Sequence, residues 1–245
     1  MKQLNILLTT FLLLLLTTFS VQANPNNQIL LDAISKNNFA LAKQAIDNGA
    51  DINYYQKGQF TPLTLAVRNK NIALAGYLIT RGADVNRPVS NATLIQTPLI
   101  IAINNNDLDI VKLLIQNGAS PNITQKSKKD IFSNQLIAKE ETSPLILAIK
   151  KDGINEPPSI EMIEYLIACG ANVNQTDGNG YTPLMAAVDY RWPSQHKLRY
   201  QIAEILLAAG AEPNVTDFDN KTALQYAYDN NFTTMVRLLS QLAPK

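Results

Sequence analysis

The sequence predicts an all-α repeat solenoid of about six helix-turn-helix units, each ending in a β-turn finger. The first observation is the phrase Gly-Ala-x-x-Asn, which recurs five times, beginning at Gly49, Gly82, Gly118, Gly170 and Gly210. The second is a Thr-Pro-Leu-like phrase that follows each copy and opens an apolar run. The third is the spacing of the first two copies, which runs from Gly49 to Gly82. A repeat interval of about 33 residues is typical of stacked helical units.

Together the two phrases resemble the ankyrin repeat over nearly all of the chain after the N-terminal segment. The openings are Thr61-Pro62-Leu63, Thr97-Pro98-Leu99, Ser143-Pro144-Leu145, Thr182-Pro183-Leu184 and the degenerate Thr222-Ala223-Leu224. One departure is consistent: the family usually has His after Thr-Pro-Leu, whereas this chain has Thr64, Ile100, Ile146, Met185 or Gln225. The departure concerns one hydrogen bond between repeats. The resemblance still implies the stacked helix-turn-helix fold.

The residues of each unit predict its helices in order. The Thr hydroxyl can cap the first helix, and Pro beside it suits the first turn, where no backbone donor is missed. Apolar residues such as Leu99 and Ala102 then fall on one helical stripe. Asn tolerates the left-handed turn that ends a helix, which accounts for Asn37, Asn106 and Asn231. A second apolar run, such as 110–115, forms the second helix, and the Gly of the repeated phrase ends it.

Spacing predicts where the repeats lose their regularity. The approximate units are 25–59, 60–95, 96–141, 142–180, 181–220 and 221–245. The Ala of the first helix and the terminating Gly are equally far apart in the first three units, at 33 and 49, 66 and 82, and 102 and 118. They are farther apart in the fourth unit, at 148 and 170, and in the fifth, at 187 and 210. The finger after Gly118 is also longer, since the next first-helix Ala comes only at 148, whereas Gly49 is followed by Ala66. The additions fall in turns, so we expect the stack of helices to continue past them.

Residues 1–23 predict a secretory signal peptide, which leaves 24–245 as the repeat domain. Lys2 is followed by an apolar run from Ile6 to Phe19 and then by a small-residue cleavage site ending at Ala23. The run is shorter than the ~20 residues that a membrane-spanning helix needs. We therefore expect an exported protein, periplasmic in a bacterium, with no membrane contact after cleavage. The alternatives are an extracellular protein or one anchored by an uncleaved signal.

Composition argues against several kinds of partner and site. Without Lys2 the chain has 20 basic and 20 acidic side chains, so it lacks the positive charge that nucleic-acid binding requires. Cys169 and His196 are the only residues of their types, and a helix C-terminus, where Cys169 lies, disfavours a thiolate. One His and one Cys provide no metal constellation. The sequence predicts no enzyme, metal or cofactor, and His196 is interpreted as an exposed loop residue.

The resemblance implies that the fingers and the exposed ends of the first helices form a concave surface that binds a protein partner. Carried over by position, the first-helix candidates are Arg68, Asn69, Asn104, Asn105, Lys150, Lys151, Asp189, Tyr190 and Asp229. The finger candidates are Tyr55, Lys57, Arg87, Thr176, Asn179 and Phe218. Tyr and Arg are among the residue types enriched at interface hot spots. The alternative interpretation is that each candidate is an ordinary solvent-facing residue.

Two irregular segments carry apolar residues whose role the sequence leaves open. In the long finger, Phe132 and Leu136 either fold back onto the neighbouring repeats or offer an apolar anchor to a partner. In the turn of the fifth unit, Tyr190 and Trp192 either cover the adjacent helices or form an aromatic contact patch. The overall prediction is a monomeric, non-catalytic protein-binding module. The alternatives are a secreted effector or inhibitor, toxin-neutralising or host-directed, and an enzyme hidden in the insertions.

Overall fold

The computed structural model describes residues 24–55, 60–90, 94–124, 126–127, 141–151, 157–189 and 195–242. The predicted signal peptide, 1–23, lies outside these ranges. The chain divides into two compact units, the first ending at Asp51 and the second beginning at Ile52. Twelve helices and three short strands lie within the described ranges, so the predicted all-α architecture is confirmed.

The first unit is a helical hairpin of α2 (Pro25–Ser35) and α3 (Phe39–Asp47). The two helices are joined by Asn37, whose φ of 52° is the left-handed turn expected there. Leu30 of α2 and Ala42 of α3 are fully buried, and the two helices pack against each other.

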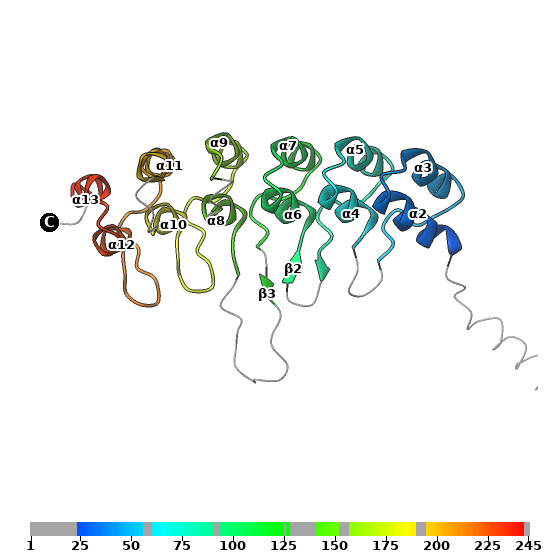
Figure 1. Cartoon of the computed structure of the whole chain (residues 1–245). Coiled ribbons are helices and arrows are strands. Elements are labelled where there is room, and N and C mark those ends of the chain that lie inside the picture. The colour runs from blue at the N-terminus through cyan, green and yellow to red at the C-terminus, as the bar shows by residue number, and fades with distance from the viewer. Residues whose placement is uncertain are drawn as a thin grey trace, which may run out of the picture. The chain divides into compact units, whose positions relative to one another are not determined.

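The described residues of the second unit form five helix pairs, whose arrangement Figure 1 shows. Its first helices are α4 (Pro62–Arg68), α6 (Pro98–Asn104), α8 (Pro144–Ile149), α10 (Pro183–Val188) and α12 (Ala223–Asp229). Its second helices are α5 (Ile72–Thr80), α7 (Leu108–Gln116), α9 (Ile160–Ala168), α11 (His196–Ala208) and α13 (Thr233–Ser240). The first helices form one layer, the second helices form another, and the fingers extend from the side of the first layer.

The fingers in the middle of this unit pair with each other. Strand β1 (Val89–Ser90) and strand β2 (Leu94–Gln96) form an antiparallel hairpin, with Val89 opposite Gln96. Strand β3 (Lys126–Ser127), from the next finger, pairs antiparallel with β2. The result is a three-stranded sheet in the order β1-β2-β3, and the sequence had not predicted this pairing between fingers. Both Phe132 and Leu136 of the long finger lie outside the described residues.

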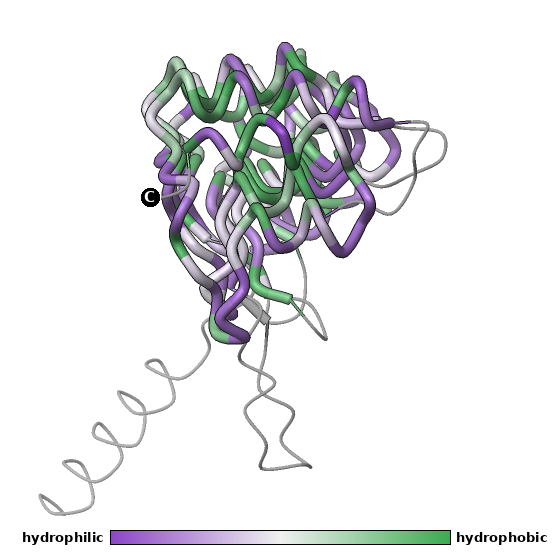
Figure 2. Tube along the Cα trace, turned by 90° about the vertical axis from the view of Figure 1, so that its left-hand side faces the viewer, coloured by the Kyte–Doolittle hydropathy of each residue, from purple (hydrophilic) through white to green (hydrophobic). Residues whose placement is uncertain are grey.

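The core of the second unit lies between the two layers. Each first helix is preceded by a Thr or Ser whose hydroxyl accepts the backbone N–H three residues on, as at Thr97 and Thr222. These capping residues are buried, apart from the half-buried Thr222. Side chains from both layers are fully buried, including Ala66, Leu78 and Leu114. Figure 2 shows the hydrophobic residues concentrated in the helices and mostly hydrophilic residues along the fingers. The small Ala residues let neighbouring helices approach closely.

The helix ends follow the predicted pattern, with one addition. Asn106 and Asn231 have φ of 54° each, and the terminating glycines of the second helices, such as Gly118 at 91°, are also left-handed. Lys70 adopts the same conformation, with φ of 56°, although its side chain is not one that favours it.

In the first four Gly-Ala-x-x-Asn phrases, the Asn side chain ties its repeat to the next. Asn86 Nδ2 donates to the Gly118 carbonyl at 2.9 Å, and Asn86 Oδ1 accepts the Ser120 N–H at 3.0 Å. The same pair of bonds is made to the following repeat by Asn53, Asn122 and Asn174. One amide thus satisfies an acceptor and a donor at the end of a neighbouring second helix. The repeated phrase marks a ladder between repeats as well as a turn.

Replacing Asn122 with Ala should lower the free energy of unfolding by about 1–2 kcal/mol, because the Gly170 carbonyl and the Asn172 N–H lose their partner. Urea denaturation followed by circular dichroism measures the loss. Asn117→Ala is the control, since the Asn117 amide bonds within its own helix, to the Leu113 carbonyl. Equal stability of the two variants would contradict a ladder between repeats.

Candidate functional site

The candidate site is the finger face, the surface formed by the fingers and by the C-terminal ends of the first helices in the second unit. Its described members include candidates from the sequence and residues that the structure adds. They are Tyr55, Phe60, Arg68, Arg87, Asn104, Lys150, Lys151, Thr176, Asn179, Asp189, Phe218, Asp219, Lys221, Asp229 and Asn230.

At the N-terminal part of the finger face, two Arg side chains rest on aromatic rings. The Arg68 guanidinium lies 4.2 Å from the centroid of the Phe60 ring, and the Arg87 guanidinium 5.9 Å from that of Tyr55. Such cation–π contacts are worth roughly 0.5–1 kcal/mol at exposed sites. These contacts hold the two Arg side chains in place. Because the face of a ring accepts none of the guanidinium N–H groups in a conventional hydrogen bond, those donors can still bind a partner.

Two of the predicted contact residues also connect successive first helices at their C-terminal ends. Asn105 Nδ2 donates to the Val67 carbonyl at 3.1 Å, and the Lys151 ammonium donates to the Asn104 carbonyl. These two bonds help to set the spacing of the finger face. A third candidate, Asn69, is the C-cap of α4.

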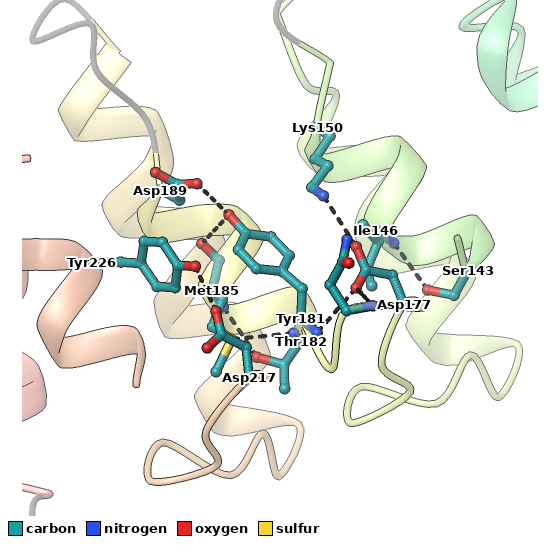
Figure 3. Close-up of polar contacts among 11 residues, drawn as sticks. Ser143, Ile146, Lys150, Asp177, Tyr181, Thr182, Met185, Asp189, Asp217 and Tyr226 are labelled. Carbon is teal, nitrogen blue, oxygen red and sulfur yellow. Dashed lines mark hydrogen bonds and ion pairs between the residues drawn. The ribbon is translucent and has the colours of Figure 1, made fainter. Parts of the chain in front are cut away.

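A buried carboxylate organises the finger before α10 (Figure 3). Asp177 Oδ1 accepts the backbone N–H groups of Asn179 at 2.9 Å and Tyr181 at 3.0 Å. Its Oδ2 lies 3.4 Å from Lys150 Nζ, which in turn lies 4.1 Å from the centroid of the Tyr181 ring. The Tyr181 hydroxyl donates to Asp189 Oδ2 at 2.9 Å. A chain of contacts therefore runs from the end of α8 through this finger to the end of α10.

A buried carboxylate organises the next finger in the same way, although the Tyr and the Lys beside it come from other positions of the repeat. Asp217 Oδ1 accepts the N–H groups of Asp219 and Lys221, both at 2.9 Å, and the Tyr226 hydroxyl donates to Asp217 Oδ2 at 2.5 Å. Lys221 Nζ lies 2.6 Å from Asp229 Oδ2 and 5.4 Å from the centroid of the Tyr226 ring. The Tyr181 and Tyr226 rings meet edge to face at 5.4 Å, which joins the two clusters.

The electrostatics of these clusters move the pKa values of Tyr181, Asp217 and Lys221 further from neutral pH. Burial raises the pKa of Tyr181, and the neighbouring Asp189 carboxylate raises it further. Burial alone would raise the pKa of Asp217, but hydrogen bonds from the Tyr226 hydroxyl and from two backbone N–H groups outweigh it and lower that pKa. The hydrogen bond and charge of Asp229 raise the pKa of Lys221. Such groups suit recognition better than proton transfer.

A pocket of about 470 Å³ opens on the finger face beside the second cluster. It is lined by Asp189, Lys221, Tyr226, Asp229, Asn230 and Asn231. Its walls come from the C-terminal ends of α10 and α12 and from the finger between them, and Asn230 Nδ2 donates to Asp189 Oδ1 at 3.2 Å across it. Two carboxylates, one ammonium and an aromatic ring thus surround one opening.

The structure brings some of the sequence candidates together and leaves others apart. Lys150, Asp189 and Asp229 lie within the linked clusters. Three further candidates are exposed on the fingers: Thr176, Asn179 and Phe218. Phe218 is 69% exposed, which is unusual for so large an apolar side chain. Five candidates lie outside the described residues: Lys57, Phe132, Leu136, Tyr190 and Trp192.

Sequence reasoning missed the residues that organise the clusters: Asp177, Tyr181, Asp217, Lys221 and Tyr226. A signal was present, since Asp177 and Asp217 each stand five positions before the Thr that caps the next helix. A carboxylate at that place can accept the N–H groups of the turn that leads into the helix.

The interpretation of His196 as an exposed loop residue is wrong. His196 is the first residue of α11, and its ring stacks on Phe232 with the centroids 4.0 Å apart. Burial there lowers the pKa of His196. Cys169 is the half-buried C-cap of α9. Among the residues that the structure describes, no group of three or more His, Cys, Asp or Glu side chains could hold a metal ion, and no helix has the length and apolar character to cross a membrane.

Comparison with known proteins identifies the family. A family model described as ankyrin repeats in three copies matches residues 6–89, 30–125 and 99–217. The chain belongs to the ankyrin-repeat family. Ankyrin repeats are protein-interaction modules and are generally non-catalytic. None of the curated proteins compared with the chain matches it.

Solved structures resemble the chain over most of its length. An ankyrin repeat domain from Acinetobacter baumannii AYE has 29% identity and a TM-score of 0.68, covering 86% of this chain and 95% of its own. The ankyrin repeat protein EF0377 has 25% identity and a TM-score of 0.69, covering 88% and 98%. A chain in the complex of the predatory endopeptidase Bd0816 from Bdellovibrio bacteriovorus with the immunity protein Bd3460 has 20% identity and a TM-score of 0.66, covering 87% and 97%. This last likeness is one of fold.

Proposed function

We propose that this ankyrin-repeat protein is exported and binds a protein partner, without catalysis, through the finger face of its second unit. The observation that carries the proposal is Phe218, an apolar side chain 69% exposed on a finger whose base is fixed by the buried Asp217. The charged Arg68, Asp189 and Asp229 are exposed on the same face. A surface that is ordered before binding loses little conformational entropy on association.

The proposed setting is the periplasm, on the strength of the signal-like segment 1–23. Cell fractionation with N-terminal sequencing tests it. A periplasmic chain that begins at Asn24 is the expected result. Recovery from culture fluid alone would favour the extracellular alternative, and an unprocessed chain in the membrane fraction would favour the anchored one.

Affinity capture from the cell envelope tests the binding proposal. Phe218→Ala and Arg68→Ala together should weaken capture of the partner roughly tenfold or more, since aromatic and Arg side chains supply most of the energy of an interface. Ile72→Ala with Arg237→Ala is the matched control, because Ile72 is 46% exposed and both lie on second helices, away from the fingers. A partner lost equally with both pairs, or with the control pair alone, would reject the assignment of the finger face.

A second candidate function is inhibition of a harmful enzyme. It is suggested by the complex of endopeptidase and immunity protein in which a chain of the same fold occurs. The captured partner would then be a hydrolase or toxin whose activity falls when the protein is added in excess. Full activity of the partner at saturating protein would exclude this role and leave the binding proposal in place.

A further inference from the structure

The C-terminal part of the finger face carries an excess of negative charge. The carboxylates of Asp189, Asp217, Asp219 and Asp229 lie on the ends of α10 and α12 and on the finger between them, and Lys221 is the basic residue among them. Because Lys221 is paired with Asp229, the remaining carboxylates have no balancing ammonium within this group. A partner that approaches here meets a field that favours cations.

The clusters around Asp177 and Asp217 differ in a way that leaves room for a ligand at the second. In the first, Lys150 Nζ lies 4.1 Å over the Tyr181 ring, so an ammonium already covers that ring. In the second, Lys221 Nζ is drawn to Asp229 and lies 5.4 Å from the centroid of the Tyr226 ring. The pocket of about 470 Å³ opens beside it. The first cluster thus shows that an ammonium can lie over a Tyr ring and beside a carboxylate on this face.

We infer that this pocket receives an Arg or Lys side chain from a basic segment of the protein partner. The inference rests on the proposed function and names the chemistry of the partner at one end of the finger face. An Arg guanidinium suits the pocket well, because its planar fork can donate to the Asp189 and Asp229 carboxylates while its face lies on the Tyr226 ring. The exposed Phe218 on the adjacent finger offers apolar contact to the residues that flank the basic side chain.

A peptide titration followed by amide NMR of the full chain tests the inference without the natural partner. The probe is acetyl-Gly-Ser-Arg-Ser-Gly-amide, and its control has citrulline, the neutral isostere, in place of Arg. The Arg peptide should shift the amides at the ends of α10 and α12, with a dissociation constant of roughly 1 mM, and the citrulline peptide should shift them much less. Equal shifts with both peptides, or none at these helix ends, would overturn the inference.

Variants that remove negative charge from the pocket provide a second test of the inference. Asp189→Asn with Asp229→Asn should weaken binding of the Arg peptide by about threefold to tenfold, as expected for two exposed ion pairs. Glu164→Gln with Glu204→Gln, exposed on α9 and α11, should leave it unchanged. If partner capture is lost with Phe218→Ala and Arg68→Ala but fully retained with the Asp pair, the pocket inference falls and the proposed function stands. If neither pair affects capture, both fall.

Discussion

Replacing Arg199 with Leu should lower the free energy of unfolding by about 2–4 kcal/mol, one of the two largest losses that we expect from a single substitution in this protein. Arg199 lies on α11 and is 1% exposed. Its Nη1 donates to the Ile149 carbonyl at 2.6 Å, and its Nη2 donates to the Lys151 carbonyl at 3.1 Å. Leu fills part of the volume but leaves both carbonyls, which lie at the C-terminal end of α8 and just beyond it, without this donor.

The physical reason lies in how α8 ends. In the regular repeat before it, α6 ends in a left-handed Asn106, and the Asp107 N–H bonds back to the Ala102 carbonyl. The residue after α8 that corresponds to Asn106 is Asp152, which lies outside the described residues. The guanidinium of Arg199 donates to the carbonyls of Ile149 and Lys151 at this end of α8, and its charge suits the negative end of the helix dipole.

Urea denaturation measures the loss, and hydrogen exchange shows where it occurs. Repeat stacks need not unfold in one step, so protection should be lost first in α8 and α10 rather than in α4. Arg199→Lys should cost less, about 1–2 kcal/mol, because one ammonium cannot replace the fork. Arg237→Leu, exposed on α13, is the control. An Arg199→Leu protein as stable as this control would mean that the α8 carbonyls find other donors.

The regular part of the fold could be predicted because its causes are local in sequence. Thr97 caps α6 through a bond to a residue three positions away, and Gly118 ends α7 by its own φ of 91°. Repetition then places successive helix pairs. The pairing of β2 with β3 was missed, because it joins strands from two different fingers whose short sequences carry no alternation to mark them.

The site was predicted in outline for a similar reason. Position in the repeat identified Asp189 and Asp229, since each stands at the end of a first helix. Position could not reveal that Tyr181 bonds to Asp189 or that Tyr226 bonds to Asp217, because those pairings depend on how each finger folds against the helix that follows it. Likewise, Arg199 lies 50 residues from the carbonyl it caps. In sequence it is one Arg in the first part of a helix that follows an irregular turn.

Asp217→Ala should cost about 2–4 kcal/mol of unfolding free energy and should also open the finger that carries Phe218, since each buried donor left without a partner is costly. The Asp217 carboxylate is buried and accepts two backbone N–H groups and the Tyr226 hydroxyl. Asp217→Asn should cost about 1 kcal/mol, because the amide oxygen can still accept the N–H groups. Asp219→Ala, exposed on the same finger, is the control for losing a carboxylate there.

The pH dependence of stability separates the contribution of the Asp217 charge from that of its hydrogen-bond geometry. Its pKa in the folded protein lies below the ordinary value of 3.8, since the hydrogen bonds outweigh the opposing effect of burial. The stabilisation is therefore fully present above about pH 5 and is lost as the pH falls through 3.8 towards the folded pKa. The stability advantage of the natural protein over Asp217→Asn should shrink between about pH 5 and pH 3. A constant difference over that range would mean that the carboxylate charge adds nothing, so that the finger beneath Phe218 is held by hydrogen-bond geometry alone.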